Sequence, residues 1–378
     1  MAALLLAALT LPLVGSASSQ DSQNWTHDGE MLKFFQAATR IRELHPDQPP
    51  LREIAGEALA GYLASLDAYS RYLDAETYAR FRASQQATYA GIGLELGADA
   101  EGHIYFIPYP GSPAAEAGLR EGQRLLRVDG TEVRGKALFE LPALIRGEPG
   151  TTVTLDLRNP DGEEERVTIE RRSFTAPTLI LENYRGIPWM RLFTFTSDTP
   201  AEMRRALNRM GADDQLLLDL RGTPGGSMFG AIDAARLFLR PDDVIATVRT
   251  GGDTKTYKAR GAPAFPTLQI FLLIDERTAS AAELFAAALV GNRRALSVGA
   301  RTLGKGKTQQ VVELLDGAAM LLTDGEILSP EGYAIEGLGV EPHLPLVGAR
   351  PDLAAHLLAI EMMLKAATEE GDGVERDE

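Results

Sequence analysis

Apolar residues recur at helical spacing in the first part of the chain, between about residues 28 and 85. Before Pro49 they stand at Met31, Phe34, Phe35, Ala38 and Ile41. The same spacing returns after Pro50, over residues 51–66. Residues three or four apart lie on one face of a helix, so the pattern predicts amphipathic helices that pack on a larger body.

The pattern changes to short alternating runs between about residues 88 and 174. Alternation of apolar and polar positions is typical of half-buried strands. We expect strands at 91–96, 103–109, 123–129, 152–158 and 164–171, with short helices near 112–118 and 137–146. An Asp161-Gly162 turn joins the last two strands. The segment therefore predicts one small β-rich domain.

From about residue 175 onward, apolar runs alternate with helical patterns. Strands are expected at 216–220, 268–274 and 296–299, and helices at 228–239, 281–290 and from about 351. Repeated strand–turn–helix order predicts an α/β sheet covered by helices. The fold class is therefore a multidomain α+β and α/β protein, with N-terminal helices, a β-rich domain, an α/β core and a C-terminal helix.

Composition narrows the functional classes. The chain has 378 residues, 44% of them hydrophobic, and a formal net charge of −15. That much apolar material supports two or three packed domains, and that much negative charge disfavours nucleic-acid binding. Cysteine is absent and the five histidines are scattered without an HExxH motif. We therefore expect no disulfide, no thiolate zinc site, no cysteine nucleophile and no metal hydrolase.

The two ends of the chain are expected to lie outside the folded body. Residues 2–14 form an apolar run too short for a membrane span, followed by Gly15 and Ala17 at a plausible cleavage site. We interpret residues 1–17 as a signal peptide, although the start lacks Lys and Arg; an uncleaved anchor or a wrongly assigned start is the alternative. Export to the periplasm or cell envelope follows. Residues 368–378 are predicted to be an acidic, mobile tail.

Two strand-to-helix turns carry residues with chemical potential. Arg221-Gly222-Thr223-Pro224-Gly225-Gly226 leaves backbone amides available for an anion, or is simply a tight turn. Ser280 precedes a helix and, with Glu283, fits a capping box. Alternatively, Ser280 is a nucleophile, and the helix N-terminus would stabilise the oxyanion that develops on the attacked carbonyl group.

A serine nucleophile needs a base, and Lys305 is a candidate. The chain has only seven lysines, and this one stands between Gly304 and Gly306 after a predicted strand. A lysine acts as a base when burial lowers its pKa; the alternative is a solvated turn residue. Gly299, Gly304 and Lys305 also match part of a phosphate-binding loop, but Gly306 stands where that loop needs Ser or Thr, so nucleotide binding is disfavoured.

Six segments together resemble the carboxyl-terminal-processing (tail-specific) serine proteases. They are LDAYSRYLDAETYARF (66–81), YAGIGLEL (89–96), GSPAAEAGLREGQRLLRVDG (111–130), LLLDLRGTPGGSMFGAIDAARLFL (217–239), IDERTASAAELFAAAL (274–289) and RALSVGARTLGKGKTQQ (294–310). Their order and spacing match the family over nearly the whole mature chain. The resemblance implies an N-terminal helical region at 26–87 that packs on the core, a PDZ domain at 88–174 and a Clp/crotonase-like protease core at 175–367.

The resemblance also implies the site residues. Ser280 falls on the nucleophile, Lys305 on the general base and Gln309 on a glutamine that helps to position the pair. The oxyanion hole would use backbone amides of Gly225 or Gly226 together with Ala281, and the implied chemistry needs no metal or organic cofactor. Small departures, such as Gly222-Thr223 in place of the usual Asn pair before Pro-Gly-Gly, remove no group with a direct catalytic role.

The PDZ domain would recognise the substrate and gate the activity of the protease core. The resemblance implies that the loop of Gly91, Ile92, Gly93 and Leu94 binds the C-terminal carboxylate of a substrate with a free, flexible tail. The sequence does not decide whether an adaptor or activator protein takes part, or whether the protein forms a homo-oligomer. The alternatives are a catalytically silent PDZ scaffold, which the intact Ser280, Lys305 and Gln309 set argues against, and a remote crotonase-type acyl-CoA enzyme, which would lack the PDZ insert.

Overall fold

The structure is a computed structural model that describes residues 29–84, 88–99, 101–136, 138–210, 214–346 and 352–374. The expected signal peptide at 1–17 and the last four residues of the tail lie outside this range. The chain divides into two compact units. The first contains the described residues of 80–308 and those from 325 onward, and the second contains those up to Ala79 together with 309–324. Within the described ranges, no helix is long and apolar enough to cross a membrane.

The second unit contains the predicted N-terminal helices, α1 (Gly29–Leu44) and α2 (Leu51–Leu66), followed by strand β1 (Arg71–Leu73). Pro50 precedes α2, as suits a residue that cannot donate inside a helix. Strand β1 pairs antiparallel with Ala319–Leu321, the start of β18 (Ala319–Leu328). Ala38 is the one buried residue of α1, and Phe34 and Phe35 are exposed; the packing of this helix on the core stays a prediction. The periodicity identifies an apolar face but not what covers it.

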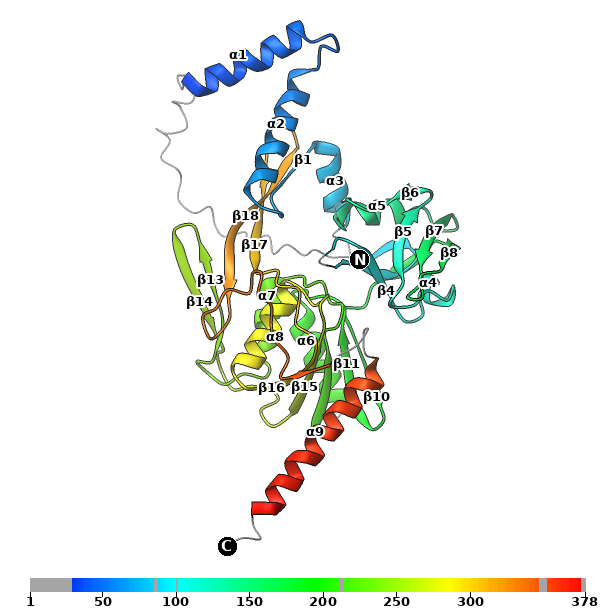
Figure 1. Cartoon of the computed structure of the whole chain (residues 1–378), viewed down its shortest axis with the longest axis vertical. Coiled ribbons are helices and arrows are strands. Elements are labelled where there is room, and N and C mark those ends of the chain that lie inside the picture. The colour runs from blue at the N-terminus through cyan, green and yellow to red at the C-terminus, as the bar shows by residue number, and fades with distance from the viewer. Residues whose placement is uncertain are drawn as a thin grey trace. The chain divides into compact units, whose positions relative to one another are not determined.

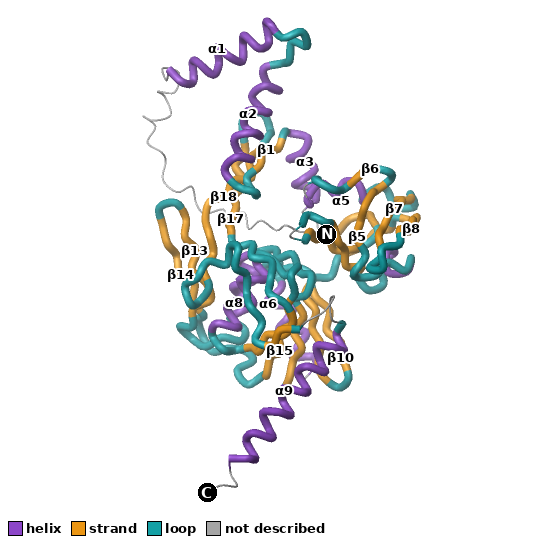
Figure 2. The backbone as a smooth tube through the Cα atoms, in the orientation of Figure 1, coloured by secondary structure: helices purple, strands orange, loops and turns teal. Residues whose placement is uncertain are grey.

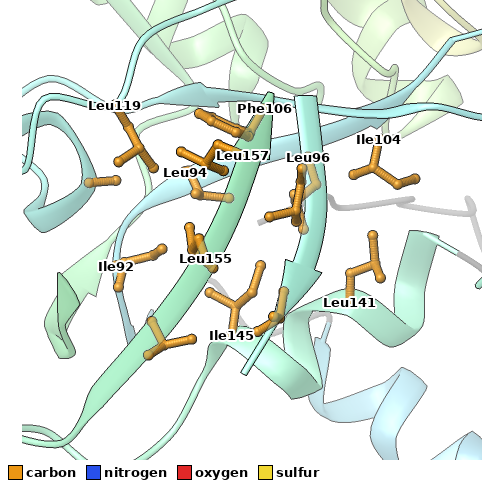
Figure 3. Packing of buried hydrophobic residues seen from close by; sticks show 14 of the residues in the cluster. Ile92, Leu94, Leu96, Ile104, Phe106, Leu119, Leu141, Ile145, Leu155 and Leu157 are labelled. Atoms are coloured by element: carbon orange, nitrogen blue, oxygen red, sulfur yellow. The ribbon is translucent and has the colours of Figure 1, made fainter. Parts of the chain in front are cut away.

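Helix α3 (Ala75–Ser84) begins in the second unit and ends in the first, which contains the β-rich region. The main sheet of this region is antiparallel. The strand order is β3-β4-β5-β7-β8, with β6 beside β5. The strands are β3 (Leu94–Ala98), β4 (Ile104–Pro108), β5 (Arg124–Val128), β6 (Thr131–Glu132), β7 (Thr152–Arg158) and β8 (Glu164–Glu170). The short helices are α4 (Pro113–Glu116), η3 (Leu138–Glu140) and α5 (Leu141–Ile145), and β2 (Thr88–Gly91) pairs with β9 (Arg172–Thr175). Figure 3 shows the core of this region, in which Leu96, Phe106, Leu141 and Leu155 meet.

An α/β core follows in the same unit (Figure 1). Its six-stranded sheet has the order β10-β11-β12-β15-β16-β19, and all neighbours except β10 and β11 are parallel. The strands are β10 (Leu179–Tyr184), β11 (Ile187–Leu192), β12 (Gln215–Asp219), β15 (Gln269–Ile274), β16 (Ala295–Gly299) and β19 (Leu344–Pro345). The parallel order places the carboxyl ends of β12, β15 and β16 at one edge, where α/β proteins hold their reacting groups.

Helices cover both faces of this sheet, which explains why β12 and β15 are apolar runs without alternation. Leu217, Phe271 and Leu273 pack with Leu357 and Ile360 of the C-terminal helix α9. The remaining helices are α6 (Thr199–Met210), α7 (Met228–Ala235) and α8 (Ala281–Gly291), and α9 spans Leu353–Val374. Helix α9 therefore continues into the first residues of the expected acidic tail. Helix α8 is buried from Ala281 to Leu289, as its nearly all-apolar sequence requires.

A second sheet accompanies the core, as the tube in Figure 2 shows. Strand β13 (Val244–Thr250) pairs antiparallel with β14 (Asp253–Lys258) and with Gly325–Leu328 of β18. Strand β17 (Lys307–Glu313) pairs with β18, and the chain passes from one unit to the other along both strands.

Candidate active site

Ser280 lies at the carboxyl edge of the parallel sheet. It follows the loop after β15 and occupies the N-cap position of α8. Its backbone has φ +57° and ψ −122°, a conformation that few non-glycine residues adopt and that often marks a functional site. Its amide donates to the Glu283 carboxylate at 2.8 Å, the half of the predicted capping box that does not use the hydroxyl.

The glycine turn lies directly against Ser280. Gly225 and Gly226 have φ +109° and +131°. A methyl group built on Gly225 would lie 2.9 Å from Cβ of Ser280 and 3.0 Å from the amide nitrogen of Ala281. Both values are below ordinary contact distance, so only glycine allows the two segments to approach this closely.

Hydrogen bonds fix the turn and leave donors available. The Gly225 carbonyl accepts from the Phe195 amide at 2.9 Å, and the Ser227 amide donates to the Phe195 carbonyl at 2.7 Å. The amides of Gly225, Gly226 and Ala281 have no hydrogen-bond partner within the described part of the chain. These three are the donors predicted for an oxyanion hole. Gly225 lies against Ser280, and Ala281 follows Ser280 directly in the chain.

Glu283 links the Lys305 segment to Ser280 by hydrogen bonds to the backbone amides of both residues. Atom Oε2 of Glu283 accepts from the amides of Ser280 and Lys305, each at 2.8 Å. The two amide nitrogens are therefore at most twice 2.8 Å, about 5.6 Å, apart. Atom Oε1 accepts from the Thr302 hydroxyl and the Gly304 amide, each at 2.6 Å. The structure thus joins the predicted nucleophile and base segments, which are separated by 25 residues in the sequence.

Gln309, the third predicted catalytic residue, belongs to the other compact unit. Its side-chain amide donates to the Tyr69 carbonyl at 2.8 Å within that unit. Its positioning role stays a prediction.

A network of buried charges supports the two loops that flank Ser280. Asp219 is bound in a two-point fashion by Arg221, at 2.8 and 2.7 Å. Burial raises the pKa of Asp219, but Arg221 and Arg191 outweigh burial and hold this pKa below its usual value. Asp275 accepts from Arg277 and also from the Gly222 amide at 2.8 Å. Asp275 therefore joins the loop before Ser280 to the glycine turn.

The β-rich region contributes one carboxylate to this network. Glu121 accepts from Arg277 at 2.7 Å and from Arg191 at 2.9 Å. Burial opposes the ionised form of Glu121, but the two arginines lower its pKa below the usual value. The Tyr105 hydroxyl donates to the Arg277 carbonyl at 3.2 Å, and the Arg277 guanidinium lies 4.9 Å from the Tyr105 ring. Sequence reasoning missed this network, because charged residues that form buried pairs cannot be distinguished in the sequence from charged residues of a solvated surface loop.

A cavity of about 900 Å³ adjoins these charges. It is bounded by Glu121, Arg158, Arg221, Arg277, Leu353 and His356 among other residues. Burial lowers the pKa of His356, so its ring is neutral near pH 7. Ser280 is not among the residues that line this cavity.

The predicted carboxylate-binding loop lies between β2 and β3. Gly93 has φ +71°, and a methyl group there would lie 2.5 Å from Cβ of Ser112. The carbonyl of Ile92 accepts from Ala114, and that of Gly93 accepts from Tyr109. Among the described residues, the amides of Ile92 and Gly93 have no hydrogen-bond partner. Gly91 ends β2, and Leu94 begins β3, an edge strand of its sheet.

One group of candidate metal ligands occurs in the described ranges. Asp99, Glu101 and His103 approach within 4.8 Å of one another in the turn between β3 and β4. The Asp99 carboxylate already accepts from the His103 amide at 2.7 Å. Among the described residues, no hydrogen bond joins these three side chains to Ser280, so they are not part of the candidate active site.

Comparison with known proteins agrees with this geometry. The model of peptidase family S41 matches residues 186–346, and a PDZ-domain model matches residues 108–159. A carboxyl-terminal-processing protease of Picosynechococcus sp. is 34% identical over 302 residues, which cover 77% of this chain and 72% of the relative. The carboxy-terminal processing protease CtpA of Bacillus subtilis is 31% identical over 350 residues, covering 90% and 74%.

A solved structure shares the fold. The photosystem II D1 C-terminal processing protease superposes with a TM-score of 0.67 at 27% identity, covering 88% of this chain and 91% of that one. Fold and family together define a serine-type peptidase with a PDZ domain. The chain belongs to the carboxyl-terminal-processing proteases of peptidase family S41.

Proposed function

We propose that this peptidase cleaves exported proteins at or near their C-terminal tails as an endopeptidase, with Ser280 as nucleophile and Lys305 as general base. The observation that supports this assignment most directly is the shared Glu283 oxygen, which holds the amides of both residues within about 5.6 Å of each other. Gly225 and Ala281 add backbone donors beside the same serine.

The proposed reaction proceeds in two stages. Neutral Lys305 takes the proton of the Ser280 hydroxyl as its oxygen bonds to the scissile carbonyl carbon. The amides of Ala281 and of Gly225 or Gly226 hold the oxyanion. Lys305 then gives its proton to the leaving amine, and the C–N bond breaks. Water, deprotonated by neutral Lys305, attacks the acyl-enzyme, and the released proton returns to Ser280.

The β-rich region would select the substrate by its free carboxylate. The amides of Ile92 and Gly93, which have no hydrogen-bond partner among the described residues, are suitable donors for a carboxylate, and β3 beside them is the last strand in the order of its sheet. An extended peptide added to β3 would gain main-chain hydrogen bonds, as in β-strand addition. Amidation of a test peptide's C-terminus should therefore weaken its binding about tenfold or more, since it removes the anionic acceptor.

Glu121 offers a route by which this region would gate the site. It reaches Arg277, three residues before Ser280, and Arg191, which donates to the Arg221 carbonyl at the start of the glycine turn. A shift of the β-rich region would thus pull on both catalytic loops.

We further infer from residues 2–14 that the enzyme acts in the cell envelope, which fractionation of cells would test.

A serine-reactive fluorophosphonate probe tests the central assignment. We expect rapid labelling of the wild-type protein, no labelling of Ser280→Ala, and slow labelling of Lys305→Ala because its serine lacks a base. Ser173→Ala, which removes an exposed hydroxyl on β9, is the matched control and should label normally. Persistent labelling or cleavage of an unfolded protein by Ser280→Ala would reject the proposal, as would an inert wild-type protein.

A further inference from the structure

Glu283 is a completely buried carboxylate that receives four hydrogen bonds. All four partners donate: three backbone amides and one hydroxyl. Burial raises the pKa of Glu283 above its usual value, and the four hydrogen bonds oppose that rise. Because a carboxylate only accepts, four converging donors suit its ionised form. Isolated buried carboxylates are costly, so a set of converging donors is needed to keep one inside the protein. Glu283 therefore has a structural environment built around its charge.

The four donors come from two separate parts of the chain. Ser280 lies on the loop after β15, whereas Thr302, Gly304 and Lys305 lie on the segment after β16. A second link, from the Leu303 amide to the Thr278 carbonyl at 3.0 Å, joins the same two segments. Glu283 reaches both residues assigned to the chemistry, and it does so through a single oxygen.

Ser280 needs such a partner because its backbone is strained. Positive φ at a serine persists only where the surroundings impose it. The bond from its amide to Glu283 fixes the orientation of this peptide plane, and the bond to the Lys305 amide fixes the base segment relative to it. Loss of the carboxylate would let the two segments relax independently.

We propose that Glu283 is a positioning residue for proteolysis, a buried anionic clamp that fixes the Ser280 and Lys305 backbones in their reactive arrangement. The inference rests on the proposed Ser280–Lys305 function. The described hydrogen bonds of Glu283 come from three backbone amides and the Thr302 hydroxyl, so none of them involves a reacting atom. Its contribution is to geometry, and an error of an ångström between a nucleophile and its base lowers the rate steeply.

The charge also has an electrostatic effect on the base. Two carboxylates accept from amides of this segment: Glu283 from Lys305, and Glu336 from Gly306 at 2.9 Å. A nearby negative charge favours the ammonium form of lysine. We therefore expect that removing the Glu283 charge favours the neutral amine of Lys305, an effect opposite in sign to the loss of geometry.

Glu283→Gln is the direct test, because it keeps the side-chain shape but presents an NH₂ group to donors. We expect kcat on a peptide to fall about 50-fold or more while KM stays within about threefold. Labelling of Ser280 by the fluorophosphonate probe should slow in parallel, since that reaction needs no substrate recognition. Glu336→Gln is the matched control: it removes a carboxylate that accepts from the Gly306 amide of the same base segment, and it should keep both constants within about threefold.

The pH profile separates positioning from general damage. Glu283→Gln should move the midpoint of the rising limb of kcat/KM to lower pH by about 0.5–1 unit, because the lysine loses an anionic neighbour. A merely weakened fold would lower the height of the profile and leave its midpoint in place. A lower midpoint together with a lower kcat is the signature expected of the clamp.

Thr302 provides a second variant in case Glu283→Gln fails to fold. Thr302→Val removes one of the four donors and should lower kcat about three- to tenfold. Thr302→Ser keeps the hydroxyl and should recover most of the loss. Wild-type kcat in Glu283→Gln, or equal values for Thr302→Val and Thr302→Ser, would overturn the inference while the proposed function stood. An unlabelled wild-type protein would instead reject the proposed function.

Discussion

Individual residues at the candidate site adopt conformations that only their neighbours explain. Ser280 has positive φ, and Gly225 packs so closely on it that no side chain fits. The sequence predicted both positions, because a Pro-Gly-Gly turn and a serine before an alanine-rich helix are visible without coordinates. It did not predict the role of Glu283 beyond a capping box, because three of its four partners lie 19 to 22 residues further along the chain.

Gly225→Ala tests the residue-scale argument. Its methyl group would lie 2.8 Å from the Ala279 carbonyl and 2.9 Å from Cβ of Ser280, so the turn must move away from the serine. We expect kcat to fall about 100-fold or more, as for loss of an oxyanion donor. Steady-state kinetics measure kcat, and circular dichroism shows whether the variant is folded.

The matched control for this variant is Gly251→Ala, in the turn between β13 and β14, where a methyl group meets nothing within 4 Å. Its kcat should equal the wild-type value. A Gly225→Ala protein that is as active as this control would show that the turn does not contribute to the oxyanion site.

Whole elements followed the sequence pattern where burial was simple. Strand β7 spans the predicted residues 152–158, and the doubly covered strands β12 and β15 agree within one residue. Strand β14 was not predicted because its residues are almost all exposed and polar, so alternation gives no signal. Strands β17 and β18 were missed for a related reason: most of their residues are half-buried on both faces.

Strands β3 and β4 also hold a buried carboxylate whose titration affects stability. Burial raises the pKa of Glu95 from 4.5 to about 7, although the Tyr109 hydroxyl donates to it. Between these pH values the folded protein retains a proton that the unfolded chain releases. The free energy of unfolding should therefore fall as pH rises from about 4.5 to 7, by up to about 1.4 kcal/mol per unit.

Glu95→Gln should remove this part of the pH dependence, because the neutral amide still accepts from Tyr109 and cannot ionise. Urea unfolding at pH 5.5 and pH 8 measures the effect. Glu101→Gln, an exposed side chain in the turn between the same strands, is the control and should follow the wild-type profile. Parallel profiles for all three proteins would contradict the prediction.

At the scale of the molecule, ion pairs within the first unit connect the β-rich region to the loops around the candidate nucleophile. Glu121 binds two arginines that reach the loops on either side of the candidate nucleophile. Since the arginines are largely buried, loss of their partner has a larger effect than loss of a surface pair. Hydrophobic periodicity does not predict such a connection, because it depends on how two separately folded regions meet.

Glu121→Gln should weaken communication between peptide binding and catalysis. We expect the ratio of cleavage rates, measured with and without a separate peptide that carries a free C-terminus, to move toward 1. Glu116→Gln removes an exposed pair with Arg172 in the same region and should keep the wild-type ratio. An unchanged ratio in Glu121→Gln would exclude this ion pair as the route of communication.

Trp189 has a further consequence for experiments on this protein. Its indole NH donates at 3.1 Å to the Asp219 carboxylate that anchors Arg221. Indole emission responds to the polarity and hydrogen bonding around the ring, so this tryptophan is a natural optical reporter of the adjoining glycine turn. Since Trp25 is the chain's other tryptophan, replacing it with phenylalanine leaves a single emitter with which ligand-induced rearrangement is followed in real time, without any attached dye.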